Sequence, residues 1–174
     1  MEHLEKIRDA LPDVARDIRV NLQNVLAAGT LSLDQVWGVG VASALSTRNH
    51  RLSEALVAEA RALGVGEPVL EDARAAAVLM AMNNVFYRFR HLVEKPAYEE
   101  KPARLRMQRI AQVTSTKADF ELFCLAVSAI GNCPSCVRAH EENVLKHGLT
   151  EDHVHDSIRV AATVNAAATA LELA

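Results

Sequence analysis

The chain has 174 residues, with 19 Lys plus Arg against 22 Asp plus Glu, and a formal net charge of −3. Half of the residues are hydrophobic but only 4% are aromatic, and there are 7 Gly and 5 Pro. Such a length is ample for one domain with a hydrophobic core. A composition this poor in aromatic and turn residues argues against a β-sandwich or barrel. A mildly acidic chain also lacks the basic face that nucleic-acid binding requires.

Neither a targeting signal nor a membrane span is expected from the sequence. Residues 1–6 carry mixed charge without the apolar segment of a signal peptide, and no stretch approaches the ~18 uninterrupted apolar residues of a membrane span. With three cysteines and no export signal, we expect a cytoplasmic protein in a reducing environment. There a CxxC pair is more often redox-catalytic or metal-binding than structural.

Apolar residues recur at helical spacing along the chain, and no segment shows the alternation of a half-buried strand. The pattern predicts an all-α fold of about eight helices in a single domain, residues 1–174. In chain order, the predicted helical segments are 4–27 with a break at Pro12, 33–45 with Trp37 as a core anchor, 53–63, 67–89, 101–111, 118–130, 134–146 and 151–173.

Two parts of the chain, roughly 30–92 and 115–174, resemble each other when shifted by about 85 residues. Chance agreement in an Ala-rich chain is the alternative, but helix breaks align as well as identities, which favours an internal duplication. At this shift Arg48 and Arg51 occupy the places of Cys133 and Cys136, so the first half is predicted to be scaffold. The aligned pairs include Ser43-Ala44-Leu45 with Ser128-Ala129-Ile130, Arg74 with Arg159, and, one residue out of register, Leu63-Gly64 with His147-Gly148.

A CxxC motif followed by a histidine carries most of the functional signal. Asn132 is expected to cap a helix that has Pro134 in its first turn. Cys133 and Cys136 then lie in that first turn, where free N–H groups and the helix dipole favour a thiolate. At about 100° per residue, both cysteines and His140 lie within about 60° of one helix face.

Three interpretations of these residues compete. A thiol–disulfide or peroxidatic site needs two nearby sulfurs, one nucleophilic and one to resolve the oxidised form. Zinc is the rival, with Cys133, Cys136 and His140 as ligands and Glu121 as a fourth, although structural zinc usually draws on two separated ligand pairs. The third interpretation is a pair of small buried residues beside an ordinary core histidine. We favour the redox site, but not a thioredoxin domain, whose motif follows a strand.

Other polar residues are assigned by their neighbours. Glu121 lies on the helix that leads into the motif; it is either a surface carboxylate or, if the two helices pack together, the group that orients His140. Cys124 is expected to be a buried, inert thiol. The residues expected to have surface, capping or supporting roles are His147, His153 and His155, together with the Asn-Asn-Val-Phe-Tyr-Arg segment 83–88, which suggests a helix bend or a subunit contact.

Taken together, several segments resemble the AhpD alkyl hydroperoxidases of the carboxymuconolactone decarboxylase-like superfamily. The segments are Trp37, residues 82–88, 105–107, 120–122 and 127–130, and the CxxCxxxHE motif from Cys133. The resemblance covers nearly the whole chain. It implies an all-helical fold with an internal repeat, and an antioxidant homotrimer whose active site lies near subunit contacts.

This resemblance also implies the roles of the site residues. Cys136 would attack the peroxide and pass through a sulfenic acid, and Cys133 would be its proton donor and its resolving partner in a redox disulfide. His140 and Glu121 would form a proton relay. Ser135 stands where well-known members have a histidine. The relay can survive this change, but the reactivity of the thiols can differ, because a neighbouring imidazolium lowers a thiol pKa.

No bound cofactor or metal is implied by the resemblance. The protein would reduce alkyl hydroperoxides and recharge an AhpC-type peroxiredoxin. Its own reductant would be the dihydrolipoyl group of a lipoylated acyltransferase, maintained by dihydrolipoamide dehydrogenase. Two alternatives remain: a non-enzymatic helical interaction module that is zinc-bound or thiol-switched, and a decarboxylase-like enzyme on the same fold. The CxxC argues against the latter, because decarboxylation needs no dithiol.

Overall fold

The computed structural model describes residues 1–27 and 29–173. Within these ranges the chain forms nine α-helices and two 3-10 turns, without a strand, so the predicted all-α fold is confirmed. The elements are α1 (Glu2–Ala10), η1 (Asp13–Ala15), α2 (Arg16–Ala27), α3 (Leu33–Thr47), α4 (His50–Ala62), α5 (Glu67–Val93), α6 (Pro96–Glu99), η2 (Gln108–Ala111), α7 (Lys117–Ile130), α8 (Pro134–Lys146) and α9 (Glu151–Leu171). The break at Pro12 separates α1 from α2, as expected.

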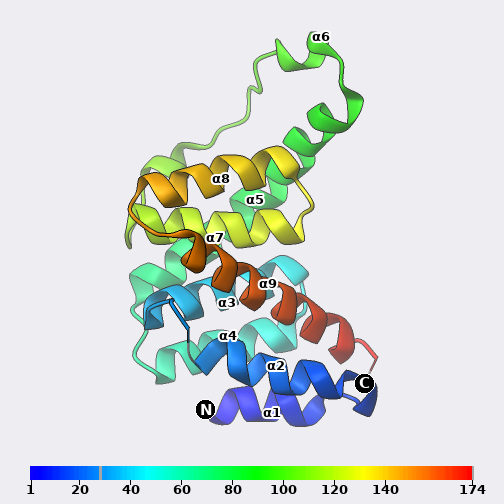
Figure 1. Ribbon diagram of the computed structural model, residues 1–174, viewed down its shortest axis with the longest axis vertical. Helices are drawn as coiled ribbons and strands as arrows, with labels where there is room; N and C mark the ends of the chain where they lie inside the picture. Colours follow the sequence, from blue (N-terminus) through cyan, green and yellow to red (C-terminus); the bar gives the residue numbers. More distant parts are fainter. Residues whose placement is uncertain (28, 174) are drawn as a thin grey trace.

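The helices are arranged in two groups that meet along α3 and α9 (Figure 1). One group contains α5, α7 and α8, and the other contains α1, α2 and α4. The short helix α6 protrudes beyond the end of α5, away from the body of the molecule. Within the described ranges, none of the helices is long and apolar enough to cross a membrane.

Two helices, α3 and α7, form the centre of the core. Residues 35–44 of α3 and residues 119–128 of α7 are buried without interruption. A helix that is buried on all sides must be apolar on all sides, as these two nearly are. Trp37 is 1% exposed and is the core anchor that the sequence predicts. Near their amino-terminal ends the two helices are joined by Gln35, whose Nε2 donates to Asp119 Oδ1 at 2.9 Å.

The helix caps of the two halves recur at an offset of 84 residues. The residues that precede α3, α4 and α5 are Ser32, Asn49 and Gly66, and those that precede α7, α8 and α9 are Thr116, Cys133 and Thr150. The counterparts of Cys133 and Cys136 are therefore Asn49 and Leu52. The assignment of Arg48 and Arg51 was wrong by one residue, because identities in an Ala-rich helix fix the register less firmly than caps do. The duplication itself stays a prediction.

The helix predicted over residues 101–111 is wrong. Only Gln108–Ala111 forms a 3-10 turn, Arg104 has a left-handed φ of +52°, and a short helix instead occupies Pro96–Glu99. The side chain of Asp72 on α5 binds this part of the chain, through Arg109 of 3-10 turn η2 and through Thr114 and Ser115 beyond it. A contact between α5 and a segment about forty residues away is invisible to local periodicity.

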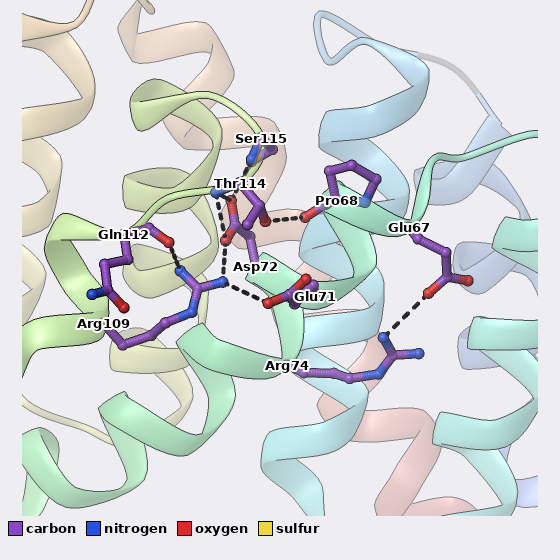
Figure 2. A network of polar contacts seen from close by, with 9 residues as sticks. All are labelled: Glu67, Pro68, Glu71, Asp72, Arg74, Arg109, Gln112, Thr114 and Ser115. Atoms are coloured by element: carbon purple, nitrogen blue, oxygen red, sulfur yellow. Dashed lines mark hydrogen bonds and ion pairs between the residues drawn. The ribbon is translucent and has the colours of Figure 1, made fainter.

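Asp72 is fully buried and accepts hydrogen bonds from three residues of this segment (Figure 2). The donors are the backbone N–H and hydroxyl of Ser115, both at 2.7 Å, the N–H of Thr114 at 3.0 Å and Nη2 of Arg109 at 2.7 Å. Burial raises the pKa of this carboxyl, but the hydrogen bonds outweigh burial and hold the pKa below its usual range. Asp72 thus fixes the segment between η2 and α7 on the surface of α5.

Gly38 permits the close packing of α3 on α7. A Cβ atom at this position would overlap the ring of Phe123. We expect Gly38→Ala to lower the free energy of unfolding by about 1–3 kcal/mol, because added atoms in a packed core force their neighbours to move. Chemical denaturation measures the change.

Gly40→Ala is the matched control on the same helix. Its Cβ would lie 3.3 Å from the end of the Leu26 side chain and 4.0 Å from those of Leu56 and Val160. Replacing a helical glycine by alanine favours the helix by up to about 1 kcal/mol. We expect this variant to be at least as stable as wild type. Equal losses in the two variants would show that the Phe123 contact does not limit the packing.

Candidate active site

The CxxC motif lies at the start of α8, immediately after a tight turn. Asn132 adopts a left-handed φ of +51° in this turn, a conformation that asparagine tolerates better than most residues. The helix begins at Pro134, as expected, but its N-cap is Cys133 and not Asn132. The Sγ atom of Cys133 accepts a hydrogen bond from the N–H of Cys136 at 3.4 Å. A cysteine sulfur therefore takes the capping place that a polar oxygen usually fills.

Cys133 and Cys136 are joined by a disulfide, with their Cα atoms 5.3 Å apart. The two residues differ in exposure: Cys133 is 0% exposed, whereas Cys136 retains 6% exposure. Cys124 is a free cysteine with 0% exposure, as the sequence predicts. Burial, reinforced by the negative charge of Glu121, raises the pKa of the Cys124 thiol well above its ordinary value. Cys124 therefore stays protonated and unreactive.

Glu121 of α7 and His140 of α8 are in direct contact across the packed helix pair. His140 Nδ1 lies 2.7 Å from Glu121 Oε2, and Lys117 Nζ lies 2.8 Å from Glu121 Oε1. Burial raises the pKa of Glu121, but the hydrogen bonds and charges of His140 and Lys117 outweigh it, so the pKa falls to about 2. Glu121 is therefore a charged carboxylate at neutral pH, and it orients the imidazole of His140.

The second nitrogen of His140 faces a thioether. Its Nε2 atom lies 3.2 Å from Sδ of Met80, a fully buried residue of α5. In the part of the chain that the structure describes, no hydrogen bond links His140 directly to either cysteine sulfur. His140 and Cys136 instead both line one cavity. The imidazole is thus held in a fixed orientation by α5 and α7 at the edge of this cavity.

The cavity has a volume of about 240 Å³ and lies between α5, α8 and 3-10 turn η2. Cys136 lines it, but Cys133 does not. Its lining is mostly apolar, with the remaining members being Asn83, Tyr87, Met107, Ile110, Ser135, Ala139 and His140. Such a cavity suits a small ligand with an apolar body and one polar end. Ile110 follows Arg109 in η2, and Arg109 binds Asp72, so this contact also holds one wall of the cavity.

The carboxyl-terminal half of α5 supports the turn that precedes the motif. Arg88 donates from Nη1 to the carbonyl of Gly131 at 2.6 Å. Asn84 donates to the carbonyl of Val127 at 3.3 Å and accepts from the Ser128 hydroxyl at 3.0 Å. A Cβ at Gly131 would overlap the amide of Asn84. The sequence suggests a bend or a subunit contact for segment 83–88. The structure shows that Asn84 and Arg88 of this segment hold the α7–α8 turn in place.

Several contacts of the site are not predicted from the sequence. Lys117 stands four residues before Glu121, a spacing that marks neighbours on a helix and could have revealed the ion pair. Met80, Met107 and Ile110 approach the motif from distant parts of the chain, and nothing in their local sequence indicates this. Among the histidines with expected minor roles, His147 follows the last turn of α8, and His153 shares a capping box with Thr150.

The residues of the zinc alternative do not assemble around a common point. Cys133 and Cys136 are bonded to each other, while His140 and Glu121 contact each other. Across residues 1–27 and 29–173, no group of three or more His, Cys, Asp or Glu side chains has an arrangement that could hold a metal ion. The geometry thus defines a dithiol–disulfide centre beside a histidine–carboxylate pair. This combination of groups is typical of a thiol oxidoreductase.

Comparison with known proteins places this centre in a family. The model of the carboxymuconolactone decarboxylase family matches residues 96–174, which include α7, α8 and α9. The alkyl hydroperoxide reductase AhpD of Anaeromyxobacter dehalogenans (strain 2CP-C) is 59% identical over 174 residues, covering 100% of this chain and 93% of that protein. The AhpD protein of Solibacter usitatus is 44% identical, covering 98% of this chain and 96% of that protein. The AhpD protein of Rhodospirillum centenum is 41% identical, covering 97% of this chain and 90% of that protein. The chain belongs to the AhpD family.

The contacts of Glu121 with Lys117 and His140 predict a pH-dependent loss of stability in acid. Because its pKa in the folded protein, about 2, lies below the ordinary value of 4.5, the carboxylate stabilises the fold fully above pH 4.5. That contribution is lost as the pH falls from about 4.5 to about 2. We expect Glu121→Gln to lower the free energy of unfolding by about 1–3 kcal/mol at pH 7, and its difference from wild type to shrink over this acid range.

Denaturant unfolding of both proteins at several pH values measures this difference. Glu142→Gln, which alters an exposed carboxylate on α8, is the matched control and should follow wild type throughout. A difference between wild type and Glu121→Gln that stays constant from pH 7 to pH 2 would contradict a depressed pKa at Glu121.

Proposed function

We propose that this protein is an alkyl hydroperoxide reductase that uses Cys133 and Cys136 as its redox centre. The observation that carries the proposal is the position of the disulfide, because one of its two cysteines, Cys136, lines an apolar cavity together with His140. The names of the relatives describe the same activity. An apolar lining suits the organic part of an alkyl hydroperoxide, and the sulfur supplies the reducing electrons.

In the proposed peroxide reaction, Cys136 is the attacking residue. Its thiolate attacks the terminal oxygen of the hydroperoxide, so that an S–O bond forms and the O–O bond breaks. Cys136 becomes a sulfenic acid, and the leaving alkoxide takes a proton to become the alcohol. Cys133 supplies this proton by way of Nε2 of His140, which contacts Met80 in the disulfide form, while Glu121 holds Nδ1. The 6% exposure of Cys136, against 0% for Cys133, favours this order of the two cysteines.

The disulfide then forms within the motif. The Cys133 thiolate attacks the sulfur of the Cys136 sulfenic acid, an S–S bond forms and the S–O bond breaks. Hydroxide leaves and takes a proton from the solvent to become water. The N–H of Cys136, which points at Cys133 Sγ, stabilises the thiolate before this attack. Each cycle transfers two electrons from the dithiol to the peroxide.

A dithiol restores the reduced enzyme, and we propose the dihydrolipoyl group of an acyltransferase, itself maintained by dihydrolipoamide dehydrogenase. One of its thiolates attacks the accessible Cys136 sulfur, forms a mixed disulfide and releases Cys133 as a thiolate. The second thiol of the same group then attacks the mixed disulfide, closes the lipoyl ring and releases Cys136. Cys133 is a good leaving group, because its sulfur accepts the capping hydrogen bond.

A thiol–disulfide exchange of the same kind would pass electrons from the reduced Cys133–Cys136 pair to an AhpC-type peroxiredoxin and so recharge it. The reduced Cys136 thiolate attacks the peroxiredoxin disulfide, and Cys133 resolves the mixed species. We further propose that the protein works as a homotrimer in the reducing cytoplasm. Ser135 lies 3.5 Å from Cys133 Sγ and lines the cavity, so it offers the motif a neutral hydroxyl where other members carry an imidazole.

Substitution of the two cysteines tests the assignment. We expect Cys136→Ser to lower peroxide-dependent oxidation of dihydrolipoamide by more than 100-fold, because the attacking sulfur is gone. In Cys133→Ser a single equivalent of peroxide should leave a Cys136 sulfenic acid, which mass spectrometry detects after trapping with a 1,3-diketone. Wild type treated in the same way should contain the Cys133–Cys136 disulfide.

Cys124→Ser is the matched control, since it removes a buried thiol that plays no part in the reaction. It should turn over like wild type. Equal turnover by wild type and Cys136→Ser would refute the assignment. Stoichiometric zinc that persists through purification, with no titratable thiols, would favour the interaction module instead.

The lipoyl step makes a separate prediction about reductants. A reductant with two thiols on one molecule completes the exchange without a second encounter, because its second thiol is held near the mixed disulfide at a high effective concentration. We expect dihydrolipoamide to reduce the oxidised protein at least 10-fold faster than glutathione at equal thiolate concentration. Stopped-flow measurement of disulfide reduction gives both rates, and equal rates would contradict a lipoyl reductant.

A further inference from the structure

Two cavities meet at the 3-10 turn η2. One is the cavity beside Cys136, of about 240 Å³. The other, which we call the outer hollow, is more open, has a volume of about 660 Å³ and includes Val113 and Lys117 in its lining. Met107 and Ile110 line both cavities. Residues that line two cavities lie between them, so Met107 and Ile110 separate the outer hollow from the cavity beside Cys136.

Ile110 contributes its side chain to this partition. Its backbone N–H donates to the carbonyl of Met107 at 3.1 Å, and its own carbonyl accepts from Nζ of Lys117 at 3.3 Å. Both backbone polar groups are therefore engaged. The side chain is partly buried and packs against the hydrophobic core. What Ile110 offers to a ligand is thus a branched apolar group.

The partition is held in place from two sides. Arg109, the residue before Ile110, binds the buried Asp72 of α5 at 2.7 Å (Figure 2). Lys117, which binds the Ile110 carbonyl, also contacts Oε1 of Glu121 on α7 at 2.8 Å. The wall is therefore tied to both helices that carry the site. A wall held in this way resists displacement by a bulky ligand.

We propose that Ile110 determines specificity in the peroxide reaction, by limiting the size of the organic group that is accepted beside Cys136. This inference rests on the proposed function and deepens it. The O–O group must reach the sulfur of Cys136, so the organic group has to occupy the rest of the cavity. At about 240 Å³, this cavity is smaller than the roughly 300–1,000 Å³ of sites for drug-sized ligands. It therefore suits hydroperoxides of small alkyl groups better than those of larger aromatic groups.

Changing the size of residue 110 tests this role. Ile110→Ala removes three carbon atoms from the partition and joins the two cavities. We expect its rate with cumene hydroperoxide, divided by its rate with tert-butyl hydroperoxide, to exceed the wild-type ratio at least about 5-fold, because one methylene group in an apolar pocket can change discrimination by about 10-fold or more. Ile110→Phe enlarges the partition and should lower the same ratio. Stopped-flow mixing of each reduced protein with each hydroperoxide gives the rates.

Val113→Ala is the matched control. Val113 belongs to the same segment and is also partly buried against the core, but it lines the outer hollow only. Its ratio should equal that of wild type. Because both rates in a ratio are measured on one protein, a loss of folded protein or of thiol reactivity cancels. Hydrogen peroxide, which has no organic group, should react with Ile110→Ala at the wild-type rate.

An unchanged ratio in both Ile110 variants, or an equal change in Val113→Ala, would overturn the inference. A fall in the rate of Ile110→Ala with all three peroxides at an unchanged ratio would give Ile110 a structural role instead. In each of these cases a wild type that reacts with hydroperoxides keeps the proposed function. If wild type is reduced by dihydrolipoamide but reacts with no peroxide, the proposed function fails, and this inference fails with it. Opposite changes of the ratio in Ile110→Ala and Ile110→Phe, with Val113→Ala like wild type, support the assignment.

Discussion

The pairing of the buried carboxylate of Glu121 with the ammonium of Lys117 and the imidazole of His140 is the interaction on which the site depends. A charged carboxylate among apolar helices would be costly without partners, and here one partner comes from its own helix and the other from α8. The pairing therefore fixes the α7–α8 hairpin and the imidazole at the same time. Because the CxxC motif starts α8, its position relative to His140 follows from the same contact.

The cap of α8 shows how a structural position can carry chemistry. In the first half of the chain the equivalent place holds Asn49, whose Oδ1 accepts from the N–H of Leu52 at 2.8 Å. In the second half Cys133 accepts from the N–H of Cys136 in the same way. The backbone N–H that bonds a side-chain oxygen at the start of α4 thus bonds a sulfur at the start of α8.

Local patterns in the sequence predict the helices, the burial of Trp37 and Cys124, and the membership of Cys133 and Cys136 in one helical turn, because each depends on spacing along one element. They fail for residues 101–111, where only a 3-10 turn forms and its Arg109 binds the buried Asp72 of α5. They also miss Met80 and Ile110, which reach the site only through packing of distant segments. The identity of the cap, Cys133 in place of Asn132, turns on a single residue in a left-handed conformation.

The burial of Cys124 has a consequence for the fidelity of the proposed redox cycle. The three cysteines of the chain allow three different internal disulfides, and only the Cys133–Cys136 disulfide serves the proposed cycle. Cys124 lies in the centre of α7 with no exposed surface, and its proton is retained because burial disfavours the thiolate. In the proposed cycle, we expect this burial to keep peroxide and a Cys136 sulfenic acid away from Cys124, so that oxidation forms the Cys133–Cys136 disulfide alone. Burial in the core of the protein thereby separates the Cys124 thiol from the redox chemistry at the start of α8.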